Sequence, residues 1–203
     1  MNEIDIQIFR FLHRALGGSW FWPMVALSAF GGGWGSLTVI PLLVWTRTRR
    51  FAGSLAAVLG VTALLVYVLK RMIGRVRPCG CLADVKALVF EPPTDFSFPS
   101  GHSAGSFAFA LFVAIVLVKR TPPNATAGAR FARRLAAFVL VLVAFGVALS
   151  RIALGVHFPG DVLAGAILGS TVAAIGANLF HTSSARPPET SARRSDGSAS
   201  LIE

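Results

Sequence analysis

Long apolar blocks alternate with short polar segments along this chain. Four blocks carry almost no charge, and they run from Phe51 to Leu69, from about 102 to 118, from about 135 to 150 and from about 161 to 180. A helix needs about 20 apolar residues to cross the hydrocarbon core of a bilayer, and the blocks are close to that length. The pattern predicts an all-α fold, a polytopic transmembrane helical bundle with about five to six membrane segments.

The first 50 residues and the last 22 are less regular. Residues 1–19 predict an amphipathic helix in the membrane interface, because apolar residues recur there at helical spacing. They are Ile4, Ile8, Phe11, Leu12 and Ala15. The segment 20–46 carries Pro23 and the run GGGWG, and it fits either one long tilted span or a re-entrant piece (20–30) followed by a span (34–46). We expect a transmembrane domain over 20–181 and a disordered cytoplasmic tail over 182–203.

Basic residues fix the expected orientation of the spans. They cluster at 47–50, at 119–134 and at 186–194, and an even number of spans separates successive clusters. All three clusters then lie on one face, which the positive-inside rule predicts to be cytoplasmic. The loop 70–99 and the turn 151–160 are predicted to lie on the opposite, outer face. A basic residue at the end of a span is usually an interfacial anchor, and we interpret Arg71, Arg75 and Lys86 in this way.

Composition supports a membrane protein and disfavours a nucleic-acid-binding protein. The chain is 54% hydrophobic and only 14% charged, with a mean hydropathy of +0.68. The net charge of +10 falls between apolar blocks and in the tail, without the aromatic interleaving typical of nucleic-acid binding. Cys79 and Cys81 are too few for a closed zinc site, and the sequence does not tell their role.

Three short segments at the outer ends of spans carry most of the chemically versatile side chains. They read KRMIGRVRP over 70–78, PSGH over 99–102 and SRIALGVHFPGD over 150–161. Together they supply cations, two histidines, a carboxylate and a glycine-containing helix start. Phosphoryl transfer needs such groups, because charge on the phosphoryl oxygens must be held, phosphorus must be attacked and the leaving oxygen must be protonated.

Several of these side chains match the binding of a phosphoryl group. Arg77 and Arg151 carry planar guanidinium forks that bind two phosphate oxygens at a time, and Lys70 adds a mobile point charge. Ser100 can cap a helix whose free N–H groups form an anion site. Gly101 allows a phosphate to approach the backbone closely.

Two histidines and a carboxylate complete the candidate site. Asp161 follows His157 by four residues, so the two side chains can meet if a helix begins near residue 158. The carboxylate would then fix the tautomer of the imidazole and stabilise its cation. His102 lies one residue past the glycine, where it can pass a proton to a leaving group.

The three segments together resemble the signature of the type 2 phosphatidic acid phosphatase family, which shares its site with vanadium haloperoxidases and bacterial acid phosphatases. That signature is K-x6-R-P, then P-S-G-H, then S-R-x5-H-x3-D. Every signature position matches, and the resemblance covers about residues 50 to 180. The matching residues are Lys70, Arg77, Pro78, Pro99, Ser100, Gly101, His102, Ser150, Arg151, His157 and Asp161.

The resemblance implies a role for each matched residue. His157 would be the nucleophile that forms a phosphohistidine, and Asp161 would orient it. His102 would be the acid for the leaving group and then the base for water. The phosphate would be bound by Lys70, Arg77, Ser100, Gly101 and Arg151. Neither a metal nor a cofactor is implied.

The predicted function is that of an integral membrane phosphatase of the bacterial plasma membrane, with its site facing outward. Undecaprenyl diphosphate is the favoured substrate. Phosphatidylglycerophosphate, phosphatidic acid and lipid A phosphates remain alternatives, because the signature recognises the phosphate and not the tail. The expected partners are the lipid-phosphate substrate and membrane lipids, without nucleic acid, and the oligomeric state is left open.

Two rival hypotheses belong to other classes. A transporter or scaffold that binds phosphate without turnover needs cations and N–H groups but neither a nucleophile nor an acid, so the two histidines favour catalysis. Haloperoxidase chemistry with bound vanadate is disfavoured, because those relatives are soluble and this chain is apolar.

Overall fold

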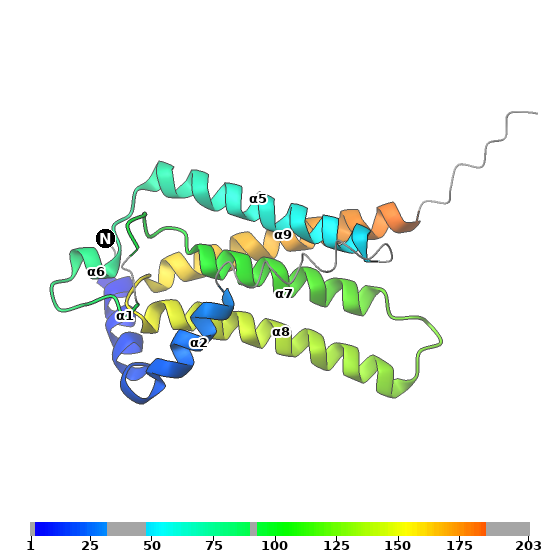
Figure 1. Ribbon diagram of the computed structural model, residues 1–203, viewed down its shortest axis with the longest axis horizontal. Helices are drawn as coiled ribbons and strands as arrows, with labels where there is room; N and C mark the ends of the chain where they lie inside the picture. The colour runs from blue at the N-terminus through cyan, green and yellow to red at the C-terminus, as the bar shows by residue number, and fades with distance from the viewer. Residues whose placement is uncertain (1–2, 32–47, 90–92, 186–203) are drawn as a thin grey trace, which may run out of the picture.

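Helices make up the regular structure of the protein. The computed structural model describes residues 3–31, 48–89 and 93–185, and every regular element in them is helical, which confirms the all-α class. Four long helices lie side by side (Figure 1): α5 (Arg49–Ile73), α7 (Gly101–Lys119), α8 (Ala127–Ala153) and α9 (Pro159–Ala185). The shorter elements are α1 (Glu3–Ala15), the 3-10 turn η1 (Gly18–Trp20), α2 (Phe21–Gly31) and α6 (Pro78–Cys81).

The four long helices are long and apolar enough to cross a membrane, in agreement with the four predicted spans. Their outward faces are apolar too: Leu64 of α5, Phe138 of α8 and Leu163 of α9 are 61%, 64% and 62% exposed. An apolar surface of this extent suits lipid rather than water, and the protein is a multi-pass membrane protein. α2 covers part of the segment 20–46, but residues 32–47 lie outside the described residues, so both interpretations of that segment stay open.

The bundle has two ends, because successive long helices run in opposite directions (Figure 1). One end holds α1, α6, the described residues between α5 and α7, and the turn between α8 and α9. The other end holds the loop between α7 and α8. The loop 70–99 and the turn 151–160 therefore lie at the same end, as expected, whereas the side of the membrane on which this end lies stays a prediction.

Local sequence signals set the end of α5 and the start of α7, and candidate site residues lie at both points. Gly74 ends α5 with a φ of 62°, and its N–H donates to the carbonyl of Lys70. Glycine adopts this left-handed conformation without the strain that a side chain adds. Ser100 is the predicted N-cap of α7, and its Oγ accepts a hydrogen bond from the N–H of Ser103. The last turn of α5 and the first turn of α7 thus face the same end of the bundle.

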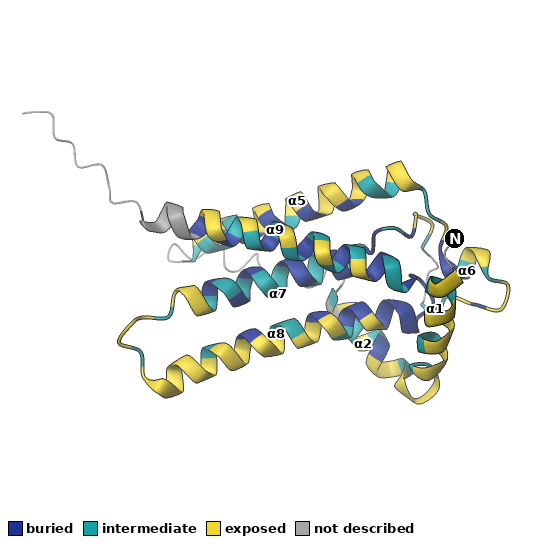
Figure 2. Cartoon of the chain, turned by 180° about the vertical axis from the view of Figure 1, so that it is seen from behind, coloured by how far each residue is buried: buried dark blue, intermediate teal, exposed yellow. Residues whose placement is uncertain are grey.

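α7 lies in the centre of the bundle, in contact with α5, α8 and α9, and Figure 2 shows how many of its residues are buried. Glycines of α9 bring the two helices together: a Cβ at Gly165 would lie 3.2 Å from the backbone nitrogen of Ala104. Small residues at such contacts let helix backbones approach closely. The first turn of α9 is therefore held against the first turn of α7.

α1 lies across the site end of the bundle (Figure 1), where the pattern predicts a helix. Its packing differs from the pattern. Phe9 is fully buried, with its ring 5.5 Å from that of Phe158, although it is not part of the predicted apolar stripe. Ile4, Ile8 and Phe11 from that stripe are 62%, 45% and 70% exposed. The stripe faces away from the protein because the opposite side of α1 carries the residues that contact the bundle.

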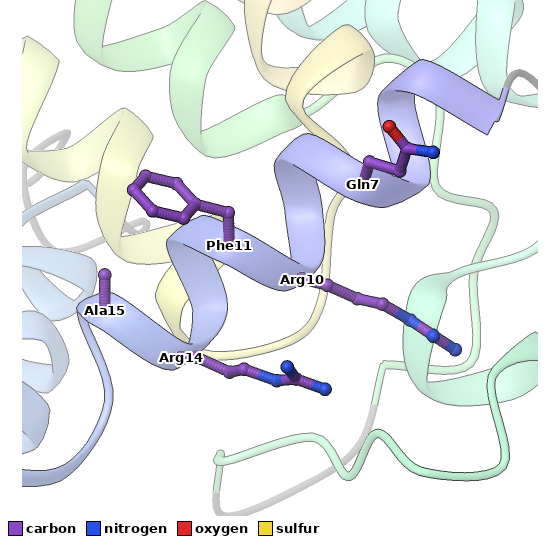
Figure 3. Close-up of a pocket in the computed structure, with 5 residues that line it drawn as sticks. All are labelled: Gln7, Arg10, Phe11, Arg14 and Ala15. Carbon is purple, nitrogen blue, oxygen red and sulfur yellow. The ribbon is translucent and has the colours of Figure 1, made fainter.

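The exposed side of α1 is amphipathic. Figure 3 shows Phe11 and Ala15 on one side of the helix, with Arg10 and Arg14 pointing to the other; together with Gln7 they line a shallow surface pocket. An apolar stripe bordered by cations is typical of a helix in the membrane interface. The position of α1 in the interface itself remains an expectation.

The last helix, α9, runs through Ala185, the last residue that the structure describes. The expected domain bounds at 19/20 and 181/182 stay predictions. Residues 186–203 of the predicted tail lie outside the described residues. Cys79 and Cys81 of α6 form no disulfide with each other.

Candidate active site

All eight predicted site residues lie at the same end of the bundle. The chain delivers them from three places: the end of α5 with the segment after it, the start of α7, and the turn from α8 to α9. They are Lys70, Arg77, Ser100, Gly101, His102, Arg151, His157 and Asp161.

His157 lies in the turn between α8 and α9 and is only 2% exposed. Its Nε2 lies 3.0 Å from Nη1 of Arg77. A guanidinium can only donate, so we assign the lone pair to Nε2 and the proton of the neutral ring to Nδ1. Nδ1 lies 3.4 Å from Oγ of Ser97 and 3.7 Å from Oδ2 of Asp161. The nucleophilic nitrogen of the neutral ring therefore faces the cations.

Asp161 is fully buried, and both of its carboxylate oxygens have partners. Oδ2 accepts hydrogen bonds from Oγ of Ser97 at 2.5 Å and from the N–H of Phe158 at 2.9 Å. Oδ1 accepts one from Nη1 of Arg75 at 2.7 Å. The expected approach of Asp161 to His157 is thus present, but the hydroxyl of Ser97 lies within hydrogen-bond range of both side chains.

Two of these partners, Ser97 and Arg75, are not among the predicted site residues. Arg75 is not the interfacial anchor that its position suggests, because its guanidinium pairs with Asp161 at 2.7 Å and with Asp5 at 2.5 Å. Ser97 lies three residues before Ser100, and this closeness to the PSGH segment is the signal that could have identified it. Nothing local relates either residue to Asp161, which follows Ser97 by 64 residues and Arg75 by 86.

Lys70 and Arg77 share one carboxylate. Nζ of Lys70 lies 2.8 Å from Oδ2 of Asp95, and Nη2 of Arg77 lies 2.6 Å from Oδ1. Arg77 also donates hydrogen bonds to the carbonyls of Asp95 and Val156, which fixes its buried guanidinium. The carboxylate of Asp95 is 56% exposed. Asp95 is thus exposed to solvent and pairs with the two cations that are predicted to bind phosphate.

Arg151 is 5% exposed near the end of α8, and its Nη1 donates a hydrogen bond to Oγ of Ser28 in α2. Among the residues that the structure describes, none accepts a hydrogen bond from its buried Nε. An unused buried donor costs free energy that a bound anion would offset. His102, in the first turn of α7, lies near Arg151, His157 and Lys70.

The start of α7 has the features of an anion site. The first N–H groups of a helix have no partners within the helix, and the helix dipole favours negative charge there. The N–H of Ser100 itself donates to the carbonyl of Asp161 at 3.0 Å, which joins the starts of α7 and α9. A Cβ at Gly101 would meet only Val66, at an ordinary 3.6 Å. Packing within the described residues therefore does not require glycine at this position.

Two side chains of the site that lie outside the membrane spans have shifted pKa values. Burial lowers the pKa of His157 to about 4, and the nearby carboxylate of Asp161 only partly opposes this. Burial acts to raise the pKa of Asp95, but the hydrogen bonds from Lys70 and Arg77 hold it at about 2. At neutral pH the imidazole of His157 is therefore neutral and Asp95 is an anion.

The PAP2 superfamily matches residues 51–185, a range that holds all eight predicted site residues. The chain belongs to the PAP2 superfamily. The resemblance based on the three signature segments is thereby confirmed. The additional partners Asp5 and Ser28 lie before the matched range of this PAP2 protein.

Similar proteins share the fold and differ in the lipid for which they are named. A lipid A 4'-phosphatase of Bacteroides thetaiotaomicron is 27% identical over 182 residues, 83% of this chain and 73% of the relative. An undecaprenyl-diphosphatase of Sulfolobus acidocaldarius is 31% identical over 181 residues, 88% and 79% of the two chains. The crystal structure of a phosphatidylglycerolphosphate phosphatase from Bacillus subtilis matches with a TM-score of 0.72 and 26% identity, covering 89% and 88%. This PAP2 protein is a membrane lipid phosphatase.

Proposed function

We propose that this PAP2 protein hydrolyses undecaprenyl diphosphate at the outer face of the bacterial plasma membrane, through a phosphohistidine at His157. The observation that carries the proposal is the contact between His157 and Arg77, in which the lone pair of Nε2 lies 3.0 Å from a guanidinium nitrogen. A phosphoryl group bound to that guanidinium would have its phosphorus beside the nucleophile.

The terminal phosphate would be bound by the cations and the start of α7. Lys70 and Arg77 would exchange the exposed carboxylate of Asp95 for phosphoryl oxygens, and Nε of Arg151 would gain an acceptor. Bidentate guanidinium contacts of this kind are shorter and stronger than neutral hydrogen bonds. The N–H groups of the first turn of α7 would add further donors near Gly101.

In the first step, Nε2 of His157 attacks the terminal phosphorus. A bond forms between nitrogen and phosphorus, the bond from phosphorus to the bridging oxygen breaks, and protonated His102 gives its proton to that oxygen. Undecaprenyl phosphate leaves. The proton on Nδ1 stays between Ser97 and Asp161, whose buried carboxylate stabilises the positive charge that develops on the ring.

In the second step, water attacks the phosphorus of the phosphohistidine. His102, now neutral, takes a proton from the water, the bond between nitrogen and phosphorus breaks, and inorganic phosphate leaves. His157 then has its lone pair on Nε2 and His102 has its proton, so the site returns to its starting state. Each histidine has one function per step, and no further proton carrier is needed.

Apolar side chains beside the cations suit a substrate with a lipid tail. Met72, Ile73 and Val76 are 76%, 51% and 54% exposed and lie between Lys70 and Arg77 in the chain. The tail can stay in the bilayer while the headgroup enters the polar end of the bundle. An outward-facing site suits the diphosphate of a polyprenyl carrier, and the undecaprenyl-diphosphatase among the relatives supports that choice.

Phosphate release by the detergent-purified protein in excess EDTA tests this proposal. The panel contains undecaprenyl diphosphate, phosphatidylglycerophosphate, phosphatidic acid and lipid A, each with the wild type and with His157→Ala. We expect the fastest release from undecaprenyl diphosphate and none with the variant, because the proposed covalent intermediate forms on the side chain that the variant lacks.

The other outcomes are equally informative. Faster release from another lipid would replace the proposed substrate and keep the mechanism. Turnover that survives in a folded His157→Ala protein would overturn the nucleophile. Loss of release in EDTA that returns with added metal would overturn the metal-free mechanism.

A further inference from the structure

The N-terminal helix contributes a side chain to the catalytic end of the bundle. Oδ2 of Asp5 in α1 lies 2.5 Å from Nη2 of Arg75, and Nη1 of the same guanidinium lies 2.7 Å from Oδ1 of Asp161. The remaining oxygen of Asp5 accepts a hydrogen bond from the N–H of Gly160, at 2.8 Å, in the first turn of α9. Asp5, Arg75 and Asp161 therefore form one continuous chain of charge-assisted hydrogen bonds, called here the Asp5–Arg75–Asp161 chain.

We propose that Arg75 is a positioning residue for Asp161, and that Asp5 of the interfacial helix α1 holds Arg75 in place. This inference rests on the proposed function, because it takes Asp161 as the partner of the nucleophile His157. It adds two residues outside the family signature, one of which lies outside the matched range of the family altogether.

The surroundings of Arg75 hold its guanidinium in one orientation. Nη2 pairs with Asp5 and Nη1 pairs with Asp161, so both terminal nitrogens of the planar guanidinium have a carboxylate partner. The guanidinium also lies over the ring of Phe158, 4.3 Å from its centroid. The same ring also contacts the ring of Phe9 in α1. An interfacial anchor would extend toward solvent, whereas this side chain is 21% exposed and bound between two carboxylates.

The contact with Arg75 fixes one oxygen of the Asp161 carboxylate. Arg75 binds Oδ1, while Oδ2 is held by Ser97 and the N–H of Phe158 and lies 3.7 Å from Nδ1 of His157. Without Arg75 the carboxylate loses its contact on Oδ1 and is positioned less precisely, which weakens the acceptor that selects the tautomer of the imidazole. Arg75 makes none of the described contacts to Lys70, Arg77 or Arg151, so its loss should affect the chemical step more than binding of the phosphate.

Asp5 connects this function to α1. Its carboxylate pairs with Arg75 and also supplies an acceptor to the unpaired N–H groups at the start of α9, the helix that carries Asp161. The exposed stripe of α1, which contains Ile4, Ile8 and Phe11, is available to the bilayer surface. The helix that is expected to lie in the membrane interface is thereby connected, through Arg75, to the carboxylate of Asp161 beside the proposed nucleophile His157.

A double-mutant cycle on the full-length protein tests the inference, with kcat and KM measured on undecaprenyl diphosphate and phosphatidic acid. We expect Arg75→Gln to lower kcat by about ten- to a hundredfold with little change in KM, the range for loss of a group that orients a reacting side chain. Asp5→Asn keeps an acceptor for Gly160 and removes the ion pair, so it should lower kcat less. The double variant should equal Arg75→Gln alone, because Asp5 acts through Arg75.

Two further variants separate positioning from folding. Arg75→Lys keeps the charge without the fork and should restore part of the lost kcat. Arg10→Gln removes the matched ion pair of α1 with Asp84, which is 3.1 Å long and exposed, and should leave kcat unchanged. The cycle would overturn the inference if Arg75→Gln kept the wild-type kcat, if the effects of Asp5→Asn and Arg75→Gln multiplied, or if Arg10→Gln lowered kcat as much as Asp5→Asn.

NMR of the ring nitrogens of His157 gives a readout that does not require turnover. The chain has four histidines, and His157→Ala assigns the signal. Above its pKa of about 4, the neutral ring of His157 should hold its proton on Nδ1 in the wild type. Arg75→Gln should position the carboxylate of Asp161 less precisely, so the ring-nitrogen shifts should move toward a mixture of the two tautomers. Unchanged ring-nitrogen shifts would overturn the inference. A wild type without phosphatase activity would refute the proposed function instead, and the ring-nitrogen shifts would still test Arg75.

Discussion

The two ends of the bundle both carry basic side chains but hold them differently. At the loop between α7 and α8, Lys119 donates a hydrogen bond to Asn178, Arg120 lies over Phe180 and Arg133 binds a carbonyl. At the site end, every ion pair between described residues is found, and the acidic partners come from α1, α9 and the loop before α7. Cations that contact an amide, a ring or a carbonyl fit the positive-inside rule, whereas buried cations in contact with carboxylates need another reason.

The proposed binding of a phosphoryl anion would supply that reason, and burial separates the two kinds of cation. Arg77 and Arg151 are 7% and 5% exposed, and a charge so far from water is costly unless it is paired. Arg134 in α8 is exposed. Under the proposal, the same residue type at the two ends of one helix has two different functions, and substitutions at both ends should separate them.

The largest contrast is expected between Arg151→Gln and Arg134→Gln, both in α8. Arg151→Gln removes a buried fork that faces the proposed phosphate, so kcat/KM should fall about 100- to 1000-fold, the range for loss of a charged transition-state contact. Arg134→Gln changes only an exposed cation and should leave kcat/KM within about twofold, as for most surface substitutions. Phosphate release and thermal unfolding of both detergent-purified variants measure this. Equal losses in both would mean that burial does not distinguish the two ends.

A smaller loss is expected from Ser97→Ala. The hydroxyl donates to Asp161 at 2.5 Å and lies 3.4 Å from Nδ1 of His157, so its removal breaks the contact between the two. A hydrogen bond to a charged group contributes about 1.5–3 kcal/mol, which corresponds to about a ten- to hundredfold loss in kcat. Ser103→Ala is a matched control, because its hydroxyl is also buried but contacts Ser100 rather than the histidine. A kcat unaffected by Ser97→Ala would remove Ser97 from the site.

Sequence periodicity and spacing predicted the four spans and the gathering of the eight candidate site residues at one end of the bundle, because both follow from local patterns. Apolar blocks of helical length report the spans, and K-x6-R-P or S-R-x5-H-x3-D are short enough to read directly. Ser97 and Arg75 were not predicted because their common partner, Asp161, lies 64 and 86 residues away in the chain. The packed face of α1 was not predicted either. Phe9 is buried against Phe158, a contact that helical periodicity alone does not reveal.

The smallest predicted effect belongs to Asp95, whose exposed carboxylate pairs with the cations that are proposed to bind phosphate. In the wild type its anion must leave Lys70 and Arg77 before a phosphoryl group can bind them. Asp95→Asn removes the competing charge, so KM should fall about two- to fivefold with kcat nearly unchanged, within the range of exposed ion pairs. Inhibition by orthophosphate should become stronger by a similar factor, whereas Asp84→Asn, which breaks only the exposed pair with Arg10, should change neither. A higher KM in Asp95→Asn would show that the carboxylate holds the two cations in place for the substrate, and the contrast between the two ends would then depend on preorganised cations rather than on anion exchange.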